Sequence, residues 1–550
     1  MQKKKRKKKS NKNSNNLLYI LIIVLVLAAG AFAYFKFFKT SSGSGNTNAT
    51  VQSNNDYVVS TSNETATKIG EEVLAKGGNA VDAAIAVSYA LGVAQPYASG
   101  IGGGGGMLIY DPSSTDYKFY DYKDAAPVSA TTKQSDIAVP GFVLGMEKIS
   151  NDLGTMDISD LIQYSVDLAR DGVEVNSDTV KAINSFASLL QNDEDYVKED
   201  GSLLAEGDKL VQSELANTLK TIQEKGSVGF YSGEIGQNIA NAAKMQLSDL
   251  SAYEVKEEKP VEGDFNGYKV VSAPAPFSGT TLIQMLKIIE KEGETSDLTD
   301  TAQYLQALDK ATTLAHYSRG KKLADPAFRK VNEQNLVTDE YIQKLIDSHA
   351  TSYSQDDESE STTHFVIVDK DGMVVSATNT LGHFYGSQDK VNGFYLNCSL
   401  KSFGTSGKNK YEAGKRPRTY TSPTIIQKDD YIMGMGTPGG VRILKMLAPI
   451  IVDDLYFGKD LQSSINKSRV IFYEPGVLML EDGRSEEYII DVSNCGYPYV
   501  DVKDQLYFGA VQAGGISNGK YFGASDLSLI HISKWCWRFN QKRCWRCWTL

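Results

Sequence analysis

The sequence predicts an α+β protein in which strands and amphipathic helices share a large core. Residues 362–380 consist of two apolar, β-branched runs joined by Asp371-Gly372, which is a strong signal for a β-hairpin. Residues 156–245 and 297–350 are mostly amphipathic and are expected to be helical. With 41% apolar residues in a chain of 550, most of the protein is expected to be globular.

The first residues predict a membrane anchor. A basic run at residues 3–9 precedes residues 17–35, which carry no charge and nearly span a bilayer. A basic flank before an apolar span places the N-terminus in the cytoplasm and the rest outside, so we expect a single-pass protein of the cell membrane with an extracytoplasmic main part. Secretion after signal-peptide cleavage is the alternative, because Ala31-Phe32-Ala33 resembles a cleavage site. The predicted order is a basic cytoplasmic tail, a transmembrane anchor and a flexible stalk: 1–16, 17–38 and 39–56.

The charge balance narrows the choice of partners. The chain carries 57 Lys+Arg against 67 Asp+Glu, and the basic tail holds eight of the positive charges, so the remainder is clearly acidic. This composition argues against a nucleic-acid partner. It does not exclude an anionic substrate, since the local field matters more than the net charge.

The C-terminal residues are anomalous in composition. All four tryptophans and three of the five cysteines lie between residues 535 and 550. We interpret residues 527–550 as an artefact of sequence assembly or of a frameshift. A genuine disulfide-bearing tail is the alternative. Only Cys398 and Cys495 precede this segment, so no disulfide framework is implied.

A glycine run follows two predicted helices. Gly77-Gly78 is expected to end a helix over residues 64–76, and Asn79 is expected to cap a buried helix over residues 80–91. Five glycines, residues 102–106, then precede an apolar strand. Ordering glycine costs more conformational entropy than ordering any other residue. We therefore expect a close approach of backbones there, or several N–H groups directed at one partner.

The strand that begins at Thr362 predicts a cleavage site. Residues 353–361 are polar and acidic, which is typical of an exposed loop, and they run directly into this strand. We expect cleavage between Ser361 and Thr362. The freed α-amine, with a reference pKa of about 7.7–8.0, can act as the base for the hydroxyl of the same threonine. The alternative is that Thr362 is an ordinary β-branched strand residue.

The hairpin brings a second hydroxyl close to Thr362. If Asp371 and Gly372 form a two-residue turn, Lys370 pairs with Met373 and Thr363 faces Thr380. The hydroxyls of Thr362 and Thr380 then become neighbours at the open end of the hairpin.

A Pro-Gly-Gly turn provides possible oxyanion donors. A strand over residues 431–435 ends at Gly436, and Gly439-Gly440 precede a predicted helix. Successive N–H groups at a helix N-terminus can hold an oxyanion. The alternative is a turn without chemistry. No metal-ligand spacing is present, and we expect no metal and no cofactor.

Together with residues 77–84, these features resemble the γ-glutamyltransferase (γ-glutamyltranspeptidase) family. The resemblance runs from about Asp56 to Asp526. Within the family, the sequence is most similar to the capsule depolymerase branch, which acts on poly-γ-glutamate. The stretches that carry this similarity are residues 99–107, 362–379 and 415–420.

The resemblance implies an N-terminal nucleophile hydrolase with a four-layer αββα sandwich. It implies a precursor that cuts itself before Thr362 into two chains, a large part (57–361) and a small part (362–526). Thr362 would attack a γ-glutamyl amide while Gly439 and Gly440 hold the oxyanion and Thr380 hydrogen-bonds the nucleophile. The γ-glutamyl group then passes to water or to an amine.

This sequence departs from the family pattern at the substrate site. The family's substrate-binding Arg is Lys123 here, which keeps the charge but loses the two-pronged contact to a carboxylate. An Asp that reads a free α-ammonium in glutathione-type members aligns with Ser402, and their paired serines align with Thr419 and Tyr420. These differences weaken recognition of a free γ-glutamyl amino terminus.

Arg418 and Arg442 are candidates for binding the carboxylates of a polymer. The alternative is that both only pair with nearby acids. The expected function is therefore self-cleavage followed by hydrolysis or transfer of γ-glutamyl amides, of poly-γ-glutamate or a wall-associated polymer. The alternatives are a glutathione hydrolase acting on small γ-glutamyl peptides and a non-catalytic, surface-binding member of the family.

Overall fold

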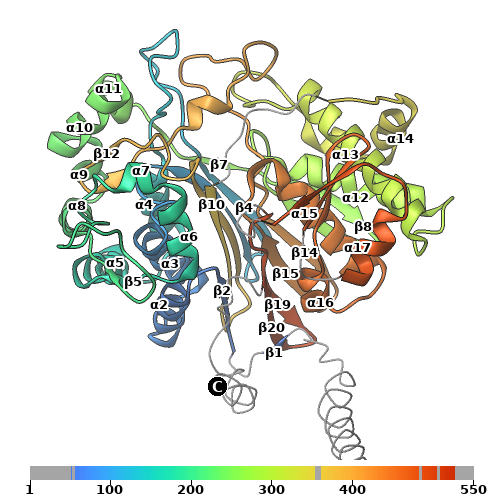
Figure 1. Cartoon of the computed structure of the whole chain (residues 1–550), viewed down its shortest axis with the longest axis horizontal. Helices are drawn as coiled ribbons and strands as arrows, with labels where there is room; N and C mark the ends of the chain where they lie inside the picture. Colours follow the sequence, from blue (N-terminus) through green and yellow to red (C-terminus); the bar gives the residue numbers. More distant parts are fainter. Residues whose placement is uncertain (1–50, 53–55, 354–360, 482–485, 504–507, 527–550) are drawn as a thin grey trace, which may run out of the picture. The chain divides into compact units, whose positions relative to one another are not determined.

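Two β-sheets lie face to face between two layers of helices (Figure 1). The computed structural model describes residues 51–52, 56–353, 361–481, 486–503 and 508–526. In Figure 1 the earlier helices, drawn in blue to green, cover one sheet, and the yellow-green to orange helices cover the other. The expected αββα order of layers is therefore observed.

The first sheet has six strands, and each strand pairs antiparallel with its neighbours. Its hairpin strands come from beyond residue 360, and its other strands come from the first half of the chain. Their order is β2 (Val58–Thr61), β10 (Ser361–Val368), β11 (Val374–Gly382), β3 (Gly104–Asp111), β4 (Asp116–Tyr122) and β7 (Lys256–Glu258).

The second sheet has seven strands, and it is also antiparallel throughout. Buried apolar side chains such as Val366, Phe277 and Ile425 fill the space between the two sheets. The strand order is β1 (Val51–Gln52), β20 (Lys520–Ser525), β19 (Gln512–Ser517), β15 (Tyr431–Gly436), β14 (Thr424–Lys428), β9 (Tyr268–Ser272) and β8 (Val261–Phe265).

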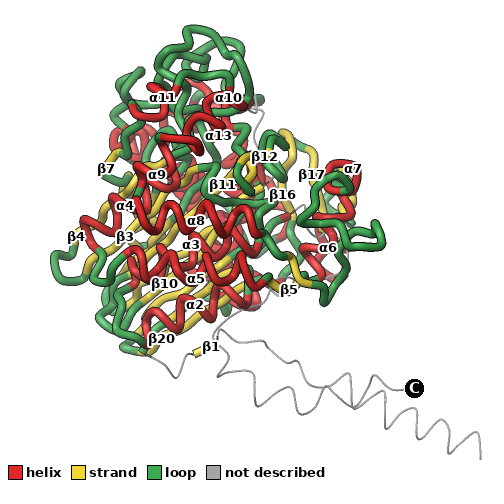
Figure 2. Tube along the Cα trace, turned by 90° about the vertical axis from the view of Figure 1, so that its left-hand side faces the viewer, coloured by secondary structure: helices red, strands yellow, loops and turns green. Residues whose placement is uncertain are grey.

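The outer faces of the sheets are covered by helices that bury apolar side chains against them. Figure 2 shows α2, α3, α5 and α8 in front of the six-stranded sheet. On this side the helices are α2 (Glu64–Ala75), α3 (Ala80–Ala94), α4 (Phe142–Leu153), α5 (Ile158–Asp171) and α8 (Ser213–Lys225). On the other side they are α12 (Gly279–Gly293), α13 (Thr301–Lys322), α14 (Asp339–Asp347) and α15 (Ile443–Ile451).

Smaller elements lie outside the sandwich. They include a three-stranded sheet of β16, β17 and β18, which the sequence did not reveal. The remaining helices are α6 (Ser177–Ser185), α7 (Ala187–Leu190), α9 (Ser227–Tyr231), α10 (Gly233–Ala243), α11 (Leu247–Ser251), α16 (Leu461–Asn466) and α17 (Glu486–Ser493). The remaining strands are β5 (Val173–Glu174), β6 (Lys209–Leu210), β12 (Lys390–Val391), β13 (Phe394–Tyr395), β16 (Val470–Glu474), β17 (Val477–Glu481) and β18 (Tyr499–Val502).

The first two predicted helices are confirmed, although α3 runs to Ala94 and not to the predicted end at Leu91. Helix α2 is followed by Gly77 at φ 96°, a left-handed conformation that ends a helix without strain in glycine. Asn79 caps α3: its Oδ1 accepts from the Asp82 N–H at 2.9 Å, and the Asp82 carboxylate accepts from the Asn79 N–H at 2.9 Å. All of α3 is buried apart from Gly92, as its apolar sequence predicts.

The predicted hairpin is present, but its predicted register is wrong by one residue. Val368 pairs with Val374 and Thr363 with Asn379, so Lys370 does not pair with Met373. Asp369 causes the longer loop, because its Oδ1 accepts from the N–H groups of Asp371 and Met373, both at 3.0 Å. Its Oδ2 accepts from the Ala80 N–H at 2.9 Å, which ties the loop to the start of α3.

Several predictions about the ends of the chain concern residues outside the described ones. These are the tail at 1–16, the anchor at 17–38 and the segment at 527–550. Within the described parts of the chain, no helix is long and apolar enough to span a membrane. Two residues of the predicted stalk, Val51–Gln52, form β1 and pair with β20, so they belong to a sheet instead of a free linker.

The glycine run allows strands to approach closely, as its composition predicted. A Cβ on Gly103 would lie 2.2 Å from the carbonyl oxygen of Thr380, and one on Gly105 would lie 2.3 Å from that of Thr378. Real side chains do not tolerate such distances. Strand β3 therefore requires glycine where it passes β11.

Gly105→Ala is expected to destabilise the protein by about 1–3 kcal/mol, because the added methyl overpacks a rigid backbone contact. The matched control is Gly320→Ala in α13, where a Cβ would meet nothing within 4 Å. That change should raise stability by about 0.5–1 kcal/mol, because alanine favours a helix interior. Urea midpoints of both variants measure the effect, and equal midpoints would contradict the close-contact explanation.

Candidate active site

Thr362 lies at an irregularity near the start of β10. The strand register shifts between Ser361, which pairs with Gly382, and Thr363, which pairs with Asn379. This bulge brings the hydroxyls of Thr362 and Thr380 to 3.4 Å from each other, so the predicted proximity is observed although the predicted pairing is not. Both side chains are buried, with 6% and 5% exposure.

Thr380 also contacts the peptide bond before Thr362. Its hydroxyl donates to the Ser361 carbonyl oxygen at 2.6 Å and accepts from the Gly382 N–H at 2.9 Å. The Thr362 hydroxyl in turn donates to Thr380. One hydroxyl therefore polarises the carbonyl next to Thr362 and lies on the path by which the Thr362 proton can leave.

Residues on both sides of this peptide bond are fixed to the loop before the glycine run. The Ser361 hydroxyl donates to the Tyr97 carbonyl oxygen at 2.6 Å. The Thr363 hydroxyl donates to the Ser99 hydroxyl at 2.9 Å. Ser361 was predicted only as a cleavage position. Nothing in the sequence indicates the hydrogen bond that its hydroxyl makes to Tyr97.

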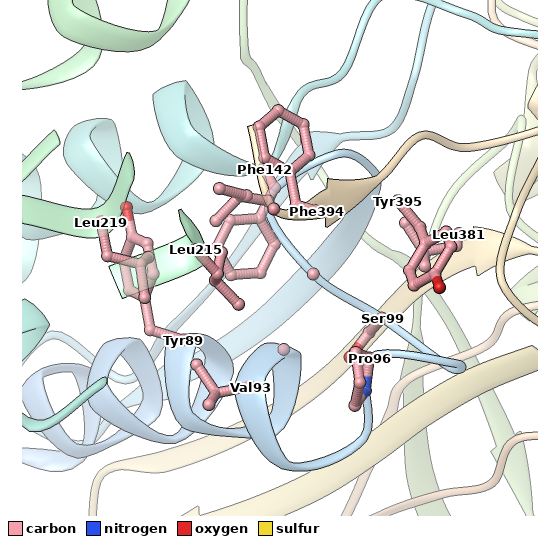
Figure 3. Close-up of a pocket in the computed structure, with 14 residues that line it drawn as sticks. Tyr89, Val93, Pro96, Ser99, Phe142, Leu215, Leu219, Leu381, Phe394 and Tyr395 are labelled. Carbon is pink, nitrogen blue, oxygen red and sulfur yellow. The ribbon is translucent and has the colours of Figure 1, made fainter. Parts of the chain in front are cut away.

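A small apolar cavity lies beside this loop (Figure 3). Its volume is about 20 Å³, roughly the space of a single water molecule. Its lining includes Pro96 and Ser99 from the loop, Leu381 next to Thr380, and Leu215 from α8. This cavity is too small to hold a γ-glutamyl group.

His364 packs against the facing sheet. Its Nδ1 lies 2.8 Å from the Thr378 hydroxyl, and a Cβ on Gly436 would lie 2.3 Å from its ring. Burial lowers the pKa of His364 to about 3, so the ring is neutral at physiological pH. A neutral ring adds no charge beside Thr362.

The same contact shows where the Pro-Gly-Gly turn lies. Gly434 meets Val366 and Gly436 meets His364, so β15 runs toward the Thr362 end of β10. Gly439 (φ 128°) and Gly440 (φ 55°) follow in this direction, before α15. The turn therefore lies at the same end of the sandwich as Thr362, and its left-handed backbone requires glycine.

The predicted substrate residues 418–420 begin the approach to β14 and pack against α13. Arg418 Nη1 donates to the carbonyl oxygens of Arg319 at 3.0 Å and Leu323 at 3.4 Å, near the end of that helix. The ring of Tyr420 is buried beneath the Arg319 guanidinium, 3.6 Å from its carbon to the ring centroid. Thr419 shares a hydrogen bond with Thr421 at 3.1 Å. These contacts give Arg418 and Tyr420 structural roles, and their contact with substrate stays a prediction.

Arg442 lies at the N-terminus of α15, directly after the Pro-Gly-Gly turn. It is buried, and its N–H donates to the Gly439 carbonyl oxygen at 3.1 Å. Lys445 lies one helical turn later, where burial and the charge of Arg442 lower the pKa of Lys445 to about 7. Its Nζ contacts the hydroxyl of Tyr353 and the carbonyl oxygen of Tyr473, both at 3.1 Å.

Lys123 follows the last residue of β4 and is buried. Strand β4, which Lys123 follows, is in the same sheet as Thr380, and only the glycine strand β3 lies between β4 and β11. Asp124, which we did not predict, is fully buried beside Lys123. The sequence could have indicated Asp124 as a site residue, because it is an acidic residue directly after Lys123 at the end of a predicted strand. Ser402 is buried too, and its carbonyl oxygen accepts from the Asn409 side chain at 2.7 Å.

The fold defines the class of the protein. It is the N-terminal nucleophile hydrolase fold of γ-glutamyltranspeptidases and acylases. A solved cephalosporin acylase from Bacillus halodurans matches with a TM-score of 0.77 at 21% identity, covering 87% of this chain and 95% of that one.

Sequence comparison gives the family. The model described as Gamma-glutamyltranspeptidase matches residues 66–529. The chain belongs to the γ-glutamyltranspeptidase family and is an enzyme of that family.

Two relatives have proenzyme names. The capsule biosynthesis protein CapD proenzyme of Bacillus anthracis is 40% identical over 83% of this chain and 86% of its own length. The glutathione hydrolase proenzyme of Bacillus subtilis (strain 168) is 30% identical over 86% of this chain and 90% of its own length.

Thr380→Val keeps the shape of the side chain and removes its hydroxyl. Self-cleavage should slow by about 100-fold, because one preorganised donor to the reacting carbonyl is lost. The half-time of precursor loss on a denaturing gel measures this rate. Thr312→Val removes a buried hydroxyl in α13, on the helix layer of the other sheet, and should cleave at nearly the original rate. Equal rates in both variants would remove Thr380 from the reaction.

Proposed function

We propose that the chain is a precursor that cuts itself between Ser361 and Thr362 and then uses Thr362 to break and transfer γ-glutamyl amides. One observation carries the proposal: Thr362, Thr380 and the Ser361 carbonyl form a hydrogen-bonded set inside a buried site. An ordinary strand threonine needs no partner hydroxyl that also binds the preceding carbonyl. The proenzyme names of the relatives support a two-chain product.

Self-cleavage proceeds as an N-to-O acyl shift followed by hydrolysis. The Thr362 oxygen bonds to the Ser361 carbonyl carbon and its proton leaves through Thr380, which donates its own proton toward the carbonyl oxygen. The proton on the former carbonyl oxygen then passes to the Thr362 nitrogen, the C–N bond breaks to give a free amine, and an ester remains between Ser361 and the Thr362 oxygen. Water cleaves this ester and leaves a carboxylate on Ser361 and a free amine on Thr362.

The mature site carries out the same chemistry on a substrate. The Thr362 amine accepts the hydroxyl proton while the oxygen attacks the γ-carbonyl. The N–H groups of the turn at Gly439 and Gly440 are the proposed donors to the oxyanion. Collapse expels the leaving amine, which takes the proton, and water or another amine then takes the γ-glutamyl group from Thr362.

For the natural substrate we propose poly-γ-glutamate. The relative with 40% identity is named for capsule biosynthesis, and Ser402 replaces the acid that would hold a free α-ammonium. Lys123 and Arg442 are the proposed carboxylate partners. Glutathione is the competing substrate, because relatives of 30–31% identity are named glutathione hydrolases.

Purified protein should convert into two fragments, one of which begins Thr-Thr-His-Phe by Edman degradation. Thr362→Ala should remain uncut, because it has no hydroxyl to attack the preceding carbonyl. Thr362→Ser keeps a hydroxyl and should still divide at the same bond. A single full-length band after long incubation of the unaltered protein would falsify the proposed mechanism.

Substrate choice can be measured with poly-γ-glutamate and glutathione under the same conditions. We expect kcat/KM to be at least about 10-fold higher for the polymer. Ser402→Asp restores a carboxylate and should raise glutathione turnover by about 10-fold, the usual effect of one charge-assisted hydrogen bond. The exposed Ser406→Asp is the control in the same loop and should change neither value. A preference of the unaltered protein for glutathione would overturn the polymer assignment.

A further inference from the structure

The peptide unit of Lys123 is held by three buried side chains. Its N–H donates to Asp121 Oδ1 at 2.8 Å. Its carbonyl oxygen accepts from the Tyr253 hydroxyl at 2.9 Å and from Arg416 Nε at 3.1 Å. Arg416 also pairs with Asp121 at 3.3 Å. Burying such an ion pair seldom adds stability, so its value here lies in fixing the end of β4.

This arrangement places Asp124 at a defined position over the glycine strand. Its Oδ2 accepts from the Ser399 hydroxyl at 2.5 Å. Its Oδ1 has no hydrogen-bond partner of good geometry among the described residues, although the N–H groups of Gly141 and of Asp124 itself lie close enough to the carboxylate to favour its ionised form. A buried carboxylate oxygen without a donor is costly, so this atom calls for a partner that the protein does not supply.

Asp124 lies at the same end of the six-stranded sheet as Thr380 and on the same face. Thr380 pairs with Gly104, and a Cβ on the same Gly104 would lie 2.8 Å from Asp124 Oδ1. Strands β11, β3 and β4 are neighbours in that order, so Thr380 and Asp124 are separated by two strand spacings, roughly 10 Å between backbones. The hydroxyl of Thr362 lies 3.4 Å from that of Thr380, so it approaches this same end. Three carbons separate the γ-carbonyl of a glutamyl group from its α-nitrogen. This length of the glutamyl group, together with the lengths of the Thr and Asp side chains, fits the separation between the two strands.

The charges near Asp124 also suit a nitrogen donor. Burial raises the pKa of Asp124 to about 7, while Lys123, the Ser399 hydroxyl and the backbone N–H groups of Gly141 and Asp124 favour its ionised form. An N–H or ammonium group against Oδ1 would add the donor that is missing. Lys123 offers the opposite charge for a carboxylate on the same α-carbon.

We propose that Asp124 receives the α-nitrogen of the γ-glutamyl substrate, next to the carboxylate already assigned to Lys123. This inference rests on the proposed γ-glutamyl activity and names the residue that reads the substituent next to the carboxylate. A free γ-glutamyl end presents an ammonium to Asp124, and an internal residue of the polymer presents an amide N–H. Thr362 is as buried as Asp124 before the cut, so substrate reaches both only in the cleaved protein.

Three anilide donors isolate the two substituents. γ-Glutamyl-p-nitroanilide carries both, glutaryl-p-nitroanilide lacks only the α-nitrogen, and 4-aminobutyryl-p-nitroanilide lacks only the α-carboxylate. The cleaved protein should show a kcat/KM for the γ-glutamyl donor about 10- to 100-fold above that for the glutaryl donor. Asp124→Asn should bring this ratio close to one. Lys123→Met should instead lower the ratio of the γ-glutamyl to the 4-aminobutyryl donor.

The controls separate this role from a merely structural one. Asp116→Asn, at the exposed start of β4, should leave both ratios unchanged. If Asp124→Asn does not fold or cleave, Ser399→Ala keeps the carboxylate, removes its orienting hydrogen bond and should lower the glutaryl ratio several-fold.

A glutaryl ratio near one in the unaltered protein would overturn the assignment while leaving the γ-glutamyl activity intact. The assignment would also be overturned if Asp124→Asn kept the same glutaryl ratio as the unaltered protein, because Oδ1 would then bind only a water molecule. Ser399→Ala gives the same test where Asp124→Asn does not fold or cleave. A cleaved protein that hydrolyses none of the donors and no γ-glutamyl polymer would instead overturn the proposed function itself.

Discussion

The hydroxyl of Thr380 is the interaction on which the candidate site depends. It accepts from Gly382, donates to the Ser361 carbonyl and lies within reach of the Thr362 hydroxyl. A side chain with one proton and two lone pairs can make no more than these contacts. The bulge at Thr362 is what makes them possible, because a regular ladder would place the two hydroxyls on different pairs.

The surrounding structure serves this geometry through close backbone contacts and buried charge. The glycines of β3 carry no side chains, so the neighbouring strands β11 and β4 and the residues around them can approach β3 closely. Beneath Lys123, the ion pair of Asp121 and Arg416 holds the end of β4 at a cost in desolvation. Rigid placement of this kind is what a site needs when small displacements of reacting groups reduce the rate strongly.

The sequence predicted the elements better than the contacts between them. Helices α2 and α3 were foreseen with their caps, because glycine and asparagine act locally at helix ends. The register of the hairpin was missed, because it is set by Asp369 bonding to the start of α3, far away in the chain. Strands β16 to β20 were not identified either, since several of them are short and carry no clean alternation.

The site shows the same division. Thr362, Thr380 and the glycine turn could be found from local chemistry. The packing of Arg418 and Tyr420 against α13 could not, because both are charged or polar residues whose neighbours come from distant sequence. Asp124 was overlooked because its importance appears only when its hydrogen bonds can be counted.

The strand order has a consequence for the two chains of the proposed cleaved form. In the six-stranded sheet, β10 and β11 lie between β2 and β3, and in the seven-stranded sheet four strands from beyond residue 362 lie between β1 and β9. Neither fragment contains all the strands of either sheet of the sandwich, so the two must unfold together. Once they have separated, reassembly depends on an encounter between two molecules, and its rate becomes second order in protein concentration. Self-cleavage would thus convert a chain that can refold alone into one whose recovery from denaturation fails on dilution.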